Sequence, residues 1–440
     1  MTRLLTVWWD TRQVGTLRVN QHGELHFEYV ADWLADSSCP AISFSLPKRE
    51  GPFKQHACRP FFAGLLPEEH QRDAVAKALG VSRGNDFRLL DALGGDVAGA
   101  LTLLPDGIAP AAPPAPDQVP RPLDDNALIG VLDALPIRPR LAGQDGLRLS
   151  LAGAQSKLPV VLSDGRVALP APGQPTTHIL KPPIARFQGT TENEALSMLL
   201  GAACGLPVAP VEARTLGGRS YLLVTRYDRR LGPDGAVSRL HQEDLCQALG
   251  IIPEHKYSTE GGPTFAVAFD LVRRATTRPA LAILALLDAA IFNVIIGNAD
   301  AHGKNFSLLY DDGWHLAPFY DLLSTVAYPD LSPTFAMKIG GCGTLEEIAS
   351  ATWLKFARDI GMAAPYVRGR VRALAIAARE HVERVATALL DGSALDRRET
   401  RRFVDLISKR AELLAVTASG ETPSRGFTRR PLRQRQPADK

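Results

Sequence analysis

Short runs in which apolar and polar positions alternate dominate the first 104 residues. Alternation with a period of two predicts strands, and polar turn residues separate the first three runs into a small antiparallel meander. Residues 71–79 instead have helical periodicity. We expect a β-rich subdomain over residues 1–104 whose aromatic side chains fill a core, and we identify no chemistry in it. Its strands are expected at residues 4–9, 15–19, 24–29, 41–46 and 98–104.

A proline-rich segment over residues 105–122 follows, with seven prolines and several alanines, and it predicts an extended connector. Beyond it, residues 123–228 alternate again after one expected helix at 124–135. A hairpin at 158–162 and 167–169 turns at Asp164-Gly165, a strand ends at Lys181, a helix spans 190–203, and a further strand begins at Tyr221. These elements predict a second lobe.

Helical periodicity takes over after residue 228. We expect a mostly helical lobe over residues 229–417 and a basic tail over 418–440 that has no fold of its own. The helices are expected at residues 241–249, 265–274, 279–296, 349–358, 364–391 and 396–414. The whole chain is therefore predicted to be an α+β protein of two lobes.

Composition and charge narrow the class of protein. Hydrophobic residues make up 45% and charged residues 22% of the 440 residues, as in ordinary globular proteins. The net charge is +3, but residues 421–440 hold five Arg and one Lys against Glu421 and Asp439, so the rest of the chain carries −1. A nearly neutral body does not predict an autonomous nucleic-acid binder.

The cysteines and the apolar segments indicate a protein of the reducing cytoplasm. The five cysteines are far apart, which favours neither a zinc site nor a disulfide framework. The N-terminus has no signal-peptide pattern. The most apolar segment, 280–296, contains Asp288 and Asn293 and is too short to predict a membrane span. We therefore expect no membrane partner.

The strongest candidate chemistry lies in the loop from Gly297 to Phe306, after the longest apolar helix. Kinases place an aspartate that orients the hydroxyl nucleophile four intervening residues ahead of a magnesium-binding asparagine, and Asp300 and Asn305 have this spacing. His302 and Lys304 of the same loop are counted among the candidate cofactor contacts.

A hairpin should bring a second acidic ligand to this loop. An apolar run over 306–310, a turn at 311–313 and a returning run over 314–319 lead to Tyr320-Asp321. Arms of nearly equal length return the chain to its starting point, so Asp321 should lie beside Asn305, where two oxygen ligands can hold one magnesium ion. A lone aspartate is more often a turn residue, but the set favours a phosphotransferase site.

A loop of small residues earlier in the chain is a candidate phosphate cradle, because small residues let backbone amides approach phosphates. It matches neither GxGxxG nor GxxxxGK[ST], so alone it predicts only a turn. The order of the elements that follow this loop is informative. A hairpin comes next, then a strand that ends at Lys181, then a helix that carries Glu192 and Glu194, which is the order found in the nucleotide-binding lobe of kinases. The loop residues are Ala152, Gly153, Ala154, Gln155, Ser156 and Lys157.

The strand that begins at Tyr221 is followed by a polar segment. This segment has the position in the chain at which the hinge between kinase lobes would contact adenine. Backbone groups of Thr225, Arg226 and Tyr227 could read the base edge, and Asp228 could accept from ribose hydroxyls. An ordinary strand end with a salt-bridged turn remains an equal alternative for this segment alone.

Taken together, these motifs resemble the HipA-type serine/threonine-protein kinases of bacterial toxin–antitoxin pairs. The similarity also includes segments 61–68, 226–230 and 242–247 and the dipeptide Lys256-Tyr257. The resemblance implies a two-lobed kinase-like fold related to the lipid kinases, with ATP and Mg²⁺ as cosubstrate and metal. It also implies a HipB-like helix-turn-helix antitoxin through which operator DNA is contacted only indirectly. The implied protein substrate is a translation protein such as an aminoacyl-tRNA synthetase.

By this resemblance, Asp300 is the catalytic base, Asn305 and Asp321 are the metal ligands and Lys181 contacts phosphate. The phosphate loop is expected to carry a self-phosphorylated serine, for which Ser150 is our choice and Ser156 the alternative. Two other readings stay open: a lipid or small-molecule kinase, because the catalytic loop also resembles that of phosphoinositide kinases, and a non-catalytic corepressor that assists a DNA-binding antitoxin.

Overall fold

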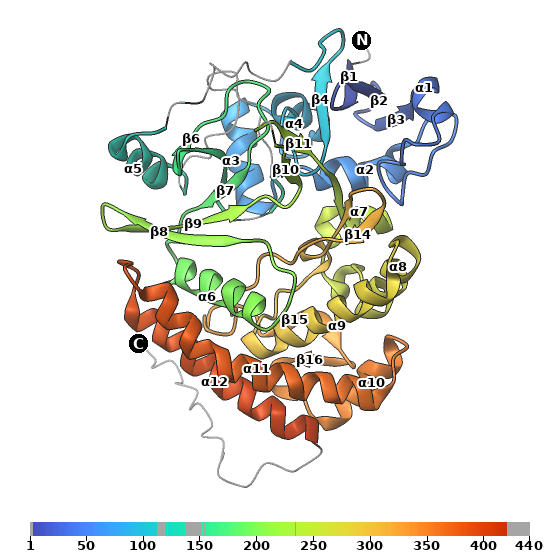
Figure 1. Ribbon diagram of the computed structural model, residues 1–440. Helices are drawn as coiled ribbons and strands as arrows, with labels where there is room; N and C mark the ends of the chain where they lie inside the picture. Colours follow the sequence, from blue (N-terminus) through green and yellow to red (C-terminus); the bar gives the residue numbers. More distant parts are fainter. Residues whose placement is uncertain are drawn as a thin grey trace, which may run out of the picture.

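The computed structural model describes residues 3–111, 120, 122–136, 151–153, 155–233 and 235–419. It has two lobes, with the N-terminal half and its sheets in the upper part of Figure 1 and the C-terminal helices at its base. Two hydrophobic cores correspond to these lobes. The predicted two-lobed α+β fold is thus confirmed.

A four-stranded antiparallel sheet of order β3-β2-β1-β4 opens the upper lobe. Its strands are β1 (Arg3–Trp9), β2 (Arg12–Val19), β3 (Leu25–Tyr29) and β4 (Leu101–Pro105). Four helices lie between the third and fourth strands, so this subdomain is as helical as it is stranded: α1 (Ala31–Ala35), α2 (Gln55–Gly64), α3 (Glu69–Leu79) and α4 (Asp86–Leu93).

The alternating segment 41–46 was expected to be a strand, and that prediction is wrong. The segment is a turn closed by a single bridge between Ser43 and Leu46. The buried hydroxyl of Tyr29 accepts from Ile42 N at 2.9 Å and donates to Leu46 O at 2.6 Å. Tertiary hydrogen bonds thus satisfy backbone groups that a neighbouring strand would otherwise have paired.

The second sheet carries the nucleotide-binding lobe and has five antiparallel strands in the order β6-β5-β7-β9-β8. One face of this sheet, with Tyr221 and Leu223, shares a core with the N-terminal subdomain, whereas Leu222 and Val224 on the other face belong to the core of the lower lobe. The two predicted units therefore pack as one body. The elements are α5 (Asp125–Ala134), β5 (Leu158–Ser163), β6 (Arg166–Ala168), β7 (His178–Lys181), α6 (Thr190–Ala203), β8 (Val211–Leu216) and β9 (Arg219–Thr225).

Two small sheets connect the lobes. Strands β10 (Arg229–Leu231) and β11 (Val237–Arg239) pair with each other, and β12 (His241–Asp244) pairs with β13 (Ser307–Tyr310), which pairs with β14 (Trp314–Leu316). Residues 241–249 were expected to be one helix, but β12 occupies the first half and α7 (Leu245–Leu249) the second. Asp244 ends the strand and caps the helix, accepting from Gln247 N at 2.9 Å.

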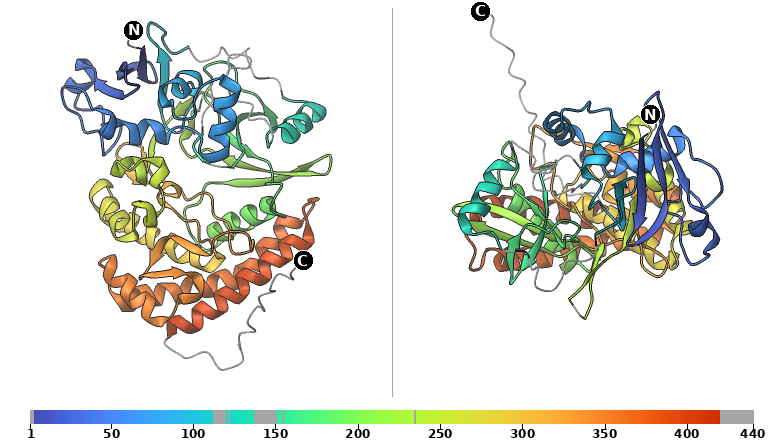
Figure 2. Two further views of the ribbon diagram at one scale, coloured as in Figure 1. Left: turned by 180° about the vertical axis from the view of Figure 1, so that it is seen from behind. Right: turned by 90° about the horizontal axis from the view of Figure 1, so that it is seen from above.

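The lower lobe is helical. The view from behind shows α11 (Ala364–Leu390) and α12 (Arg397–Ser419), in orange and red, crossing the base of the molecule beneath α6 and α9 (Pro279–Ile296) (Figure 2). In the described part of the chain, α9 alone is long and apolar enough to cross a membrane, but 61% of it is buried inside the protein, as in a core helix. The remaining elements are α8 (Phe265–Ala275), β15 (Thr334–Ile339), β16 (Cys342–Thr344) and α10 (Ser350–Asp359).

Candidate active site

Lys181, the last residue of β7, lies between two carboxylates at the junction of the lobes. Its ammonium donates to Glu194 Oε1 of α6 at 2.6 Å and also forms an ion pair with Asp321. Lys181 and Glu194 are buried, whereas about a third of the Asp321 side chain (34%) is exposed. A lysine on a strand, steadied by a helix glutamate and facing an aspartate of the other lobe, is the arrangement that kinases use to hold phosphates.

The hairpin predicted from the sequence places Asp321. Strands β13 and β14 pair from Leu308 opposite Leu316 to Tyr310 opposite Trp314. At its mouth, the Tyr320 hydroxyl donates to Lys304 O at 2.7 Å, which brings the residue before Asp321 against the residue before Asn305. Asp321 has a φ of +53°, a left-handed conformation that costs about 1 kcal/mol or more.

The catalytic loop is held from below by α9 and from the side by the segment after Asp321. Gly297 ends α9 with a φ of +76°, and a side chain there would meet Val326 at 2.5 Å. Asn298 accepts from Asp300 N at 3.0 Å, and Thr325 Oγ1 accepts from Ala299 N at 2.8 Å. These bonds fix the backbone that leads into Asp300, and His302 N donates to Asp300 O at 2.9 Å on its other side.

Asp300 is open to solvent but surrounded by protein groups. Desolvation by the surrounding protein raises the pKa of Asp300 to about 6, although the nearby Lys256 ammonium and the Tyr257 hydroxyl oppose the rise. The negative charge of Asp321 adds to it, which places the two carboxylates in one electrostatic environment. A base with a pKa near the working pH suits proton acceptance from a hydroxyl group.

The phosphate loop lies against the same site. Lys157 donates to Ala152 O at 2.6 Å, and burial lowers the pKa of Lys157 while Asp321 opposes the shift. Gly153 has a φ of +117°, a backbone conformation that other residues rarely adopt, so this position favours glycine. Gln155 donates to Pro182 O at 3.3 Å, just after Lys181. Ala154 and Ser150 lie outside the described residues.

His302 and Lys304 have different surroundings. His302 is buried against Tyr257, with ring centroids 5.5 Å apart, and burial together with Lys256 lowers the pKa of His302 to about 3. The imidazole is therefore neutral at physiological pH. Lys304 donates to Asp244 at 2.6 Å and lies 3.6 Å from Glu68 Oε1. This lysine supports the loop from within the protein, and the structure does not direct it to a nucleotide as the sequence predicted.

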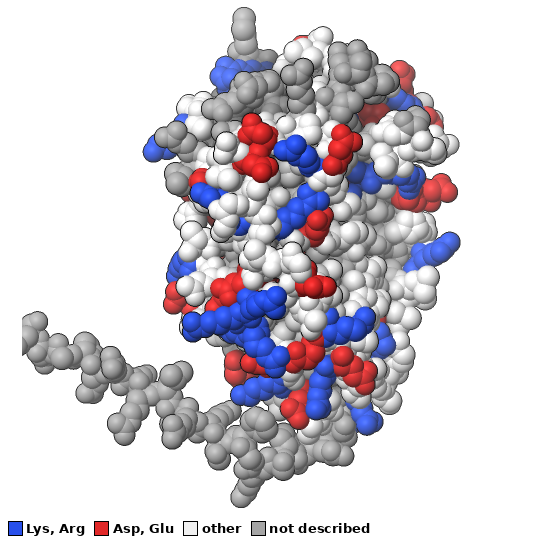
Figure 3. All heavy atoms as spheres, turned by 60° about the vertical axis from the view of Figure 1, so that its left-hand side comes forward, with Lys and Arg blue, Asp and Glu red and all other residues white. Residues whose placement is uncertain are grey.

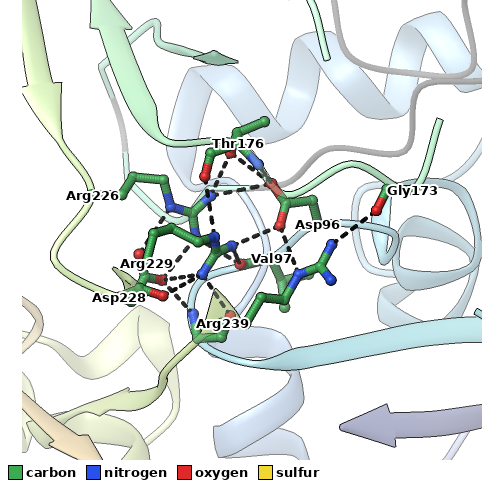
Figure 4. A network of polar contacts seen from close by, with 9 residues as sticks. Asp96, Val97, Gly173, Thr176, Arg226, Asp228, Arg229 and Arg239 are labelled. Carbon is green, nitrogen blue, oxygen red and sulfur yellow. Dashed lines mark hydrogen bonds and ion pairs between the residues drawn. The ribbon is translucent and has the colours of Figure 1, made fainter. Parts of the chain in front are cut away.

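The expected hinge is only partly brought to the site. Tyr227 stacks on Tyr320 with ring centroids 5.7 Å apart, and Thr225 ends β9 opposite His178. Arg226 and Asp228 instead point into a buried cluster with Asp96, Arg229 and Arg239 (Figure 4).

The Asp228 carboxylate is fully engaged in this cluster. It accepts from Arg226 at 2.9 and 2.8 Å and from Gly99 N at 2.7 Å. The predicted ribose contact is therefore corrected, because Asp228 has a structural role. The sequence showed an Asp-Arg-Arg turn here but could not show that Asp96, more than a hundred residues earlier, would complete it.

Sequence reasoning missed several residues near Asp300. Glu68 and Glu69 come from the subdomain in which we saw no chemistry, and both bind Lys256, at 3.0 and 2.9 Å. Burial and the nearby Asp300 carboxylate raise the pKa of Tyr257. Segment 61–68 and the dipeptide Lys256-Tyr257 belong to the motifs that carry the family resemblance, and this is the signal in the sequence that points to them.

The donor set suits a magnesium ion more than a transition metal. Asn305 and Asp321 offer oxygen atoms from an amide and a carboxylate, the ligand type that Mg²⁺ prefers, usually with substrate phosphates completing the shell. Among the described residues, no group of three or more His, Cys, Asp or Glu side chains gathers as a metal site. A site of two protein ligands shared with phosphates agrees with both observations.

The fold and the site define a phosphotransferase of the kinase type, with a lysine–glutamate pair in one lobe and two aspartates in the other. Residues 149–389 match the HipA-like C-terminal domain, and residues 5–104 match the HipA N-terminal domain. The chain belongs to the HipA family of serine/threonine-protein kinases.

Individual relatives agree with this assignment. A protein of Sinorhizobium fredii NGR234 named as the kinase Y4mE is 58% identical over 94% of this chain and 99% of its own length. The serine/threonine-protein kinase toxin HipA of Shewanella oneidensis MR-1 is 32% identical over 72% of this chain and 76% of its own. A solved complex of HipA, HipB and operator DNA from that organism matches with a TM-score of 0.82 and 28% identity, covering 94% of this chain and 98% of that chain.

Proposed function

We propose that this protein is an ATP- and magnesium-dependent serine/threonine-protein kinase that acts as the toxin of a toxin–antitoxin pair. The observation that carries the proposal is the meeting of Lys181, Glu194, Asp321 and Asp300 at the lobe junction. These residues come from a strand, a helix, a hairpin mouth and a loop that are distant in the sequence. An aspartate that only formed a solvated turn would not be expected to lie together with the other three residues.

Each residue has a defined task in this proposal. Asp300 orients the substrate hydroxyl and accepts its proton, which its pKa of about 6 permits at neutral pH. Lys181 and Lys157 offer ammonium groups to phosphate oxygens, and Glu194 holds Lys181 in place. Asn305 and Asp321 would hold Mg²⁺, which when bound neutralises charge on the phosphates.

The activity is tested with radiolabelled ATP. The purified protein is incubated with γ-labelled ATP and magnesium, together with heat-treated bacterial lysate or with lipid vesicles. Label in lysate protein that is lost with EDTA and with Asp300→Asn supports the proposal. Label only in lipid would replace it with a lipid kinase. Absence of ATP binding, with growth inhibition unchanged by Asp300→Asn, would establish the corepressor reading.

The substrate and the self-phosphorylation are finer proposals from the family resemblance. We propose a translation protein, such as an aminoacyl-tRNA synthetase, as the substrate, and Ser150 as the site of self-phosphorylation. Phosphoproteomics of cells that express wild type or Asp300→Asn tests the first. Peptide mass spectrometry after incubation with ATP and magnesium tests the second, and phosphate only on Ser156, or none in the loop, contradicts it.

The partner is proposed to be a HipB-like antitoxin that makes the sequence-specific DNA contacts, in a cytoplasmic complex. The Shewanella complex of HipA, HipB and operator DNA supports this, as does the charge of the surface. In Figure 3, Lys and Arg side chains alternate with Asp and Glu over the face shown. On α11 and α12 such pairs include Arg401 with Glu383 at 2.8 Å and with Asp405 at 3.0 Å. High-affinity operator binding by this chain alone at physiological salt would contradict the assignment.

A further inference from the structure

One turn of the N-terminal subdomain contacts both loops of the active site. This turn, the Pro67–Gln71 corner, consists of the end of the connection from α2 and the first residues of α3. On one side it meets the phosphate loop: Glu68 N donates to Gly153 O at 3.1 Å, and Gln71 Nε2 lies 2.9 Å from Ser156 Oγ. Pro67 and Gly153 form a parallel bridge, so the backbone of the loop is attached as well as its side chains.

On its other side the corner meets the support of the catalytic loop. The Glu68 carboxylate binds Lys256 at 3.0 Å through Oε2 and lies 3.6 Å from Lys304 through Oε1. Lys304 is in the catalytic loop itself, and Lys256 precedes Tyr257 and is close enough to Asp300 for its charge to act on that carboxyl group. Glu68, Lys256 and Lys304 are each less than 10% exposed, so water screens these charges little.

The corner also has a strained backbone. Glu69 has a φ of +46°, which an ordinary side chain rarely adopts. Asp10, Asp164 and Asp312, which share this conformation, occupy turns between strands, whereas Glu69 and Asp321 both lie beside the active site. A second clamp fixes the segment that carries Lys256, because Arg59 of α2 binds Glu254 at 2.6 Å.

We infer that the Pro67–Gln71 corner positions the two halves of the active site relative to each other, with Gln71 acting on the phosphate loop and Glu68 acting, through Lys256 and Lys304, on the loop of Asp300. This inference rests on the proposed kinase function. Neither residue touches the reacting atoms, so both are positioning residues. The N-terminal subdomain then takes part in organising the active site and does not merely pack against it.

Because Gln71 and Glu68 act on different loops, we expect their variants to change different kinetic constants. Gln71→Ala removes the contact with Ser156 and should raise the KM for ATP several-fold with little change in kcat. Glu68→Gln keeps the shape and removes the charge that holds two lysines, so kcat should fall about tenfold to a hundredfold, the scale of a misplaced catalytic group. Asp73→Asn is the matched control, because Asp73 lies on the same helix in a surface pair with Arg83 at 3.2 Å.

The assay measures label transfer from γ-labelled ATP to heat-treated lysate protein over a range of ATP concentrations. The double variant Glu68→Gln with Lys256→Gln separates positioning from mere stability. If Glu68 acts through Lys256, the loss of kcat in the double variant is smaller than the product of the two single losses. Independent losses that multiply, in parallel with a falling Tm, would overturn the inference.

Hydrogen exchange provides a readout that does not require activity. Glu68→Gln should speed exchange in peptides covering residues 151–157 and 298–306, whereas Asp73→Asn should leave both unchanged. Unchanged exchange in both peptides with wild-type kcat overturns the inference while the kinase function stands. A wild-type protein that binds no ATP and transfers no label overturns the proposed function, and the exchange experiment then still decides whether the corner holds the two loops.

Discussion

Two buried charge clusters lie at the two ends of β7, and they differ in how completely their charges are paired. At the start of the strand, Thr176 and Asp96 join three arginines, and the carboxylate oxygens of Asp96 accept from Arg229 at 2.6 Å and from Thr176 Oγ1 at 2.6 Å (Figure 4). At its end, Lys181 meets Glu194 and Asp321. The first cluster is closed to solvent, and the second is not.

The charges of the second cluster are less completely paired within the protein than those of the first. Asp321 is about a third exposed (34%), and burial would raise its pKa, but Lys181 and Lys157 lower it below its ordinary value. Within the described part of the chain, no carboxylate lies within ion-pair distance of Lys157, whose ammonium donates to a neutral carbonyl. A closed cluster holds protein elements together, whereas a partly open one has charge left for a ligand. Sequence motifs alone did not separate the two.

The largest expected effect comes from the open cluster and its neighbour. Asp300→Asn should reduce phosphoryl transfer at least about a thousandfold, because the base is lost, while the ATP affinity and the fold are retained. Asp321→Asn should abolish transfer and also weaken binding of magnesium-ATP, because a metal ligand is lost. Calorimetric titration with magnesium-ATP measures the difference. Equal loss of nucleotide binding in both variants would contradict this division of roles.

Loss of a charge from the closed cluster, the one around Asp96, should lower the free energy of unfolding. Asp96→Asn removes one of the charges that face Arg226, Arg229 and Arg239, and an uncompensated buried cation costs about 3–5 kcal/mol. Denaturant unfolding measures the loss. The surface variant Asp73→Asn should change the free energy of unfolding by less than about 1 kcal/mol. If Asp96→Asn were as stable as that control, the cluster would not be the structural clamp described here.

A change at Lys157 should have a smaller effect than those above, and it should lower ATP affinity without lowering stability. Lys157→Met removes a cation that faces Asp321 but holds no other protein element, so ATP affinity should fall about tenfold, as for one charge-assisted hydrogen bond. The Tm should stay the same or rise slightly, because burial disfavours this ammonium. Titration and thermal denaturation measure the two quantities. A Tm that falls as far as that of Asp96→Asn would place Lys157 among the structural charges.

The smallest expected effect is a shift in the pH profile. Activity should fall as the pH drops through about 6, where Asp300 takes up its proton. Lys256→Met removes a cation that lowers this pKa, so the acid limb should move to higher pH. Because the folded-state pKa is raised above the ordinary 3.8, protonation of Asp300 stabilises the fold as the pH falls through this window. Circular dichroism over the same range separates lost activity from unfolding.

Local pattern was sufficient for much of the fold. The meander, the hairpin of β5 and β6, the helices α6 and α8 to α12 and the hairpin that returns to Asp321 all follow from periodicity and turn residues, which act over a few positions. The errors came where distant partners decided. Residues 41–46 became a turn through Tyr29, and residues 241–244 became a strand by pairing with β13.

For the candidate site, the sequence by itself was sufficient to select Asp300, Asn305, Asp321 and Lys181 as candidates, because kinase spacing, a hairpin of equal arms and a lysine at a strand end are local features. Only the tertiary structure decided that Asp228 and Lys304 are supports within the protein and that Glu68 reaches the catalytic loop. The physical reason is that the role of a charged side chain depends on which opposite charges surround it in the folded protein. Some of those partners lie far apart along the chain, such as Asp244 and Lys304, which are 60 residues apart, and no periodicity connects them.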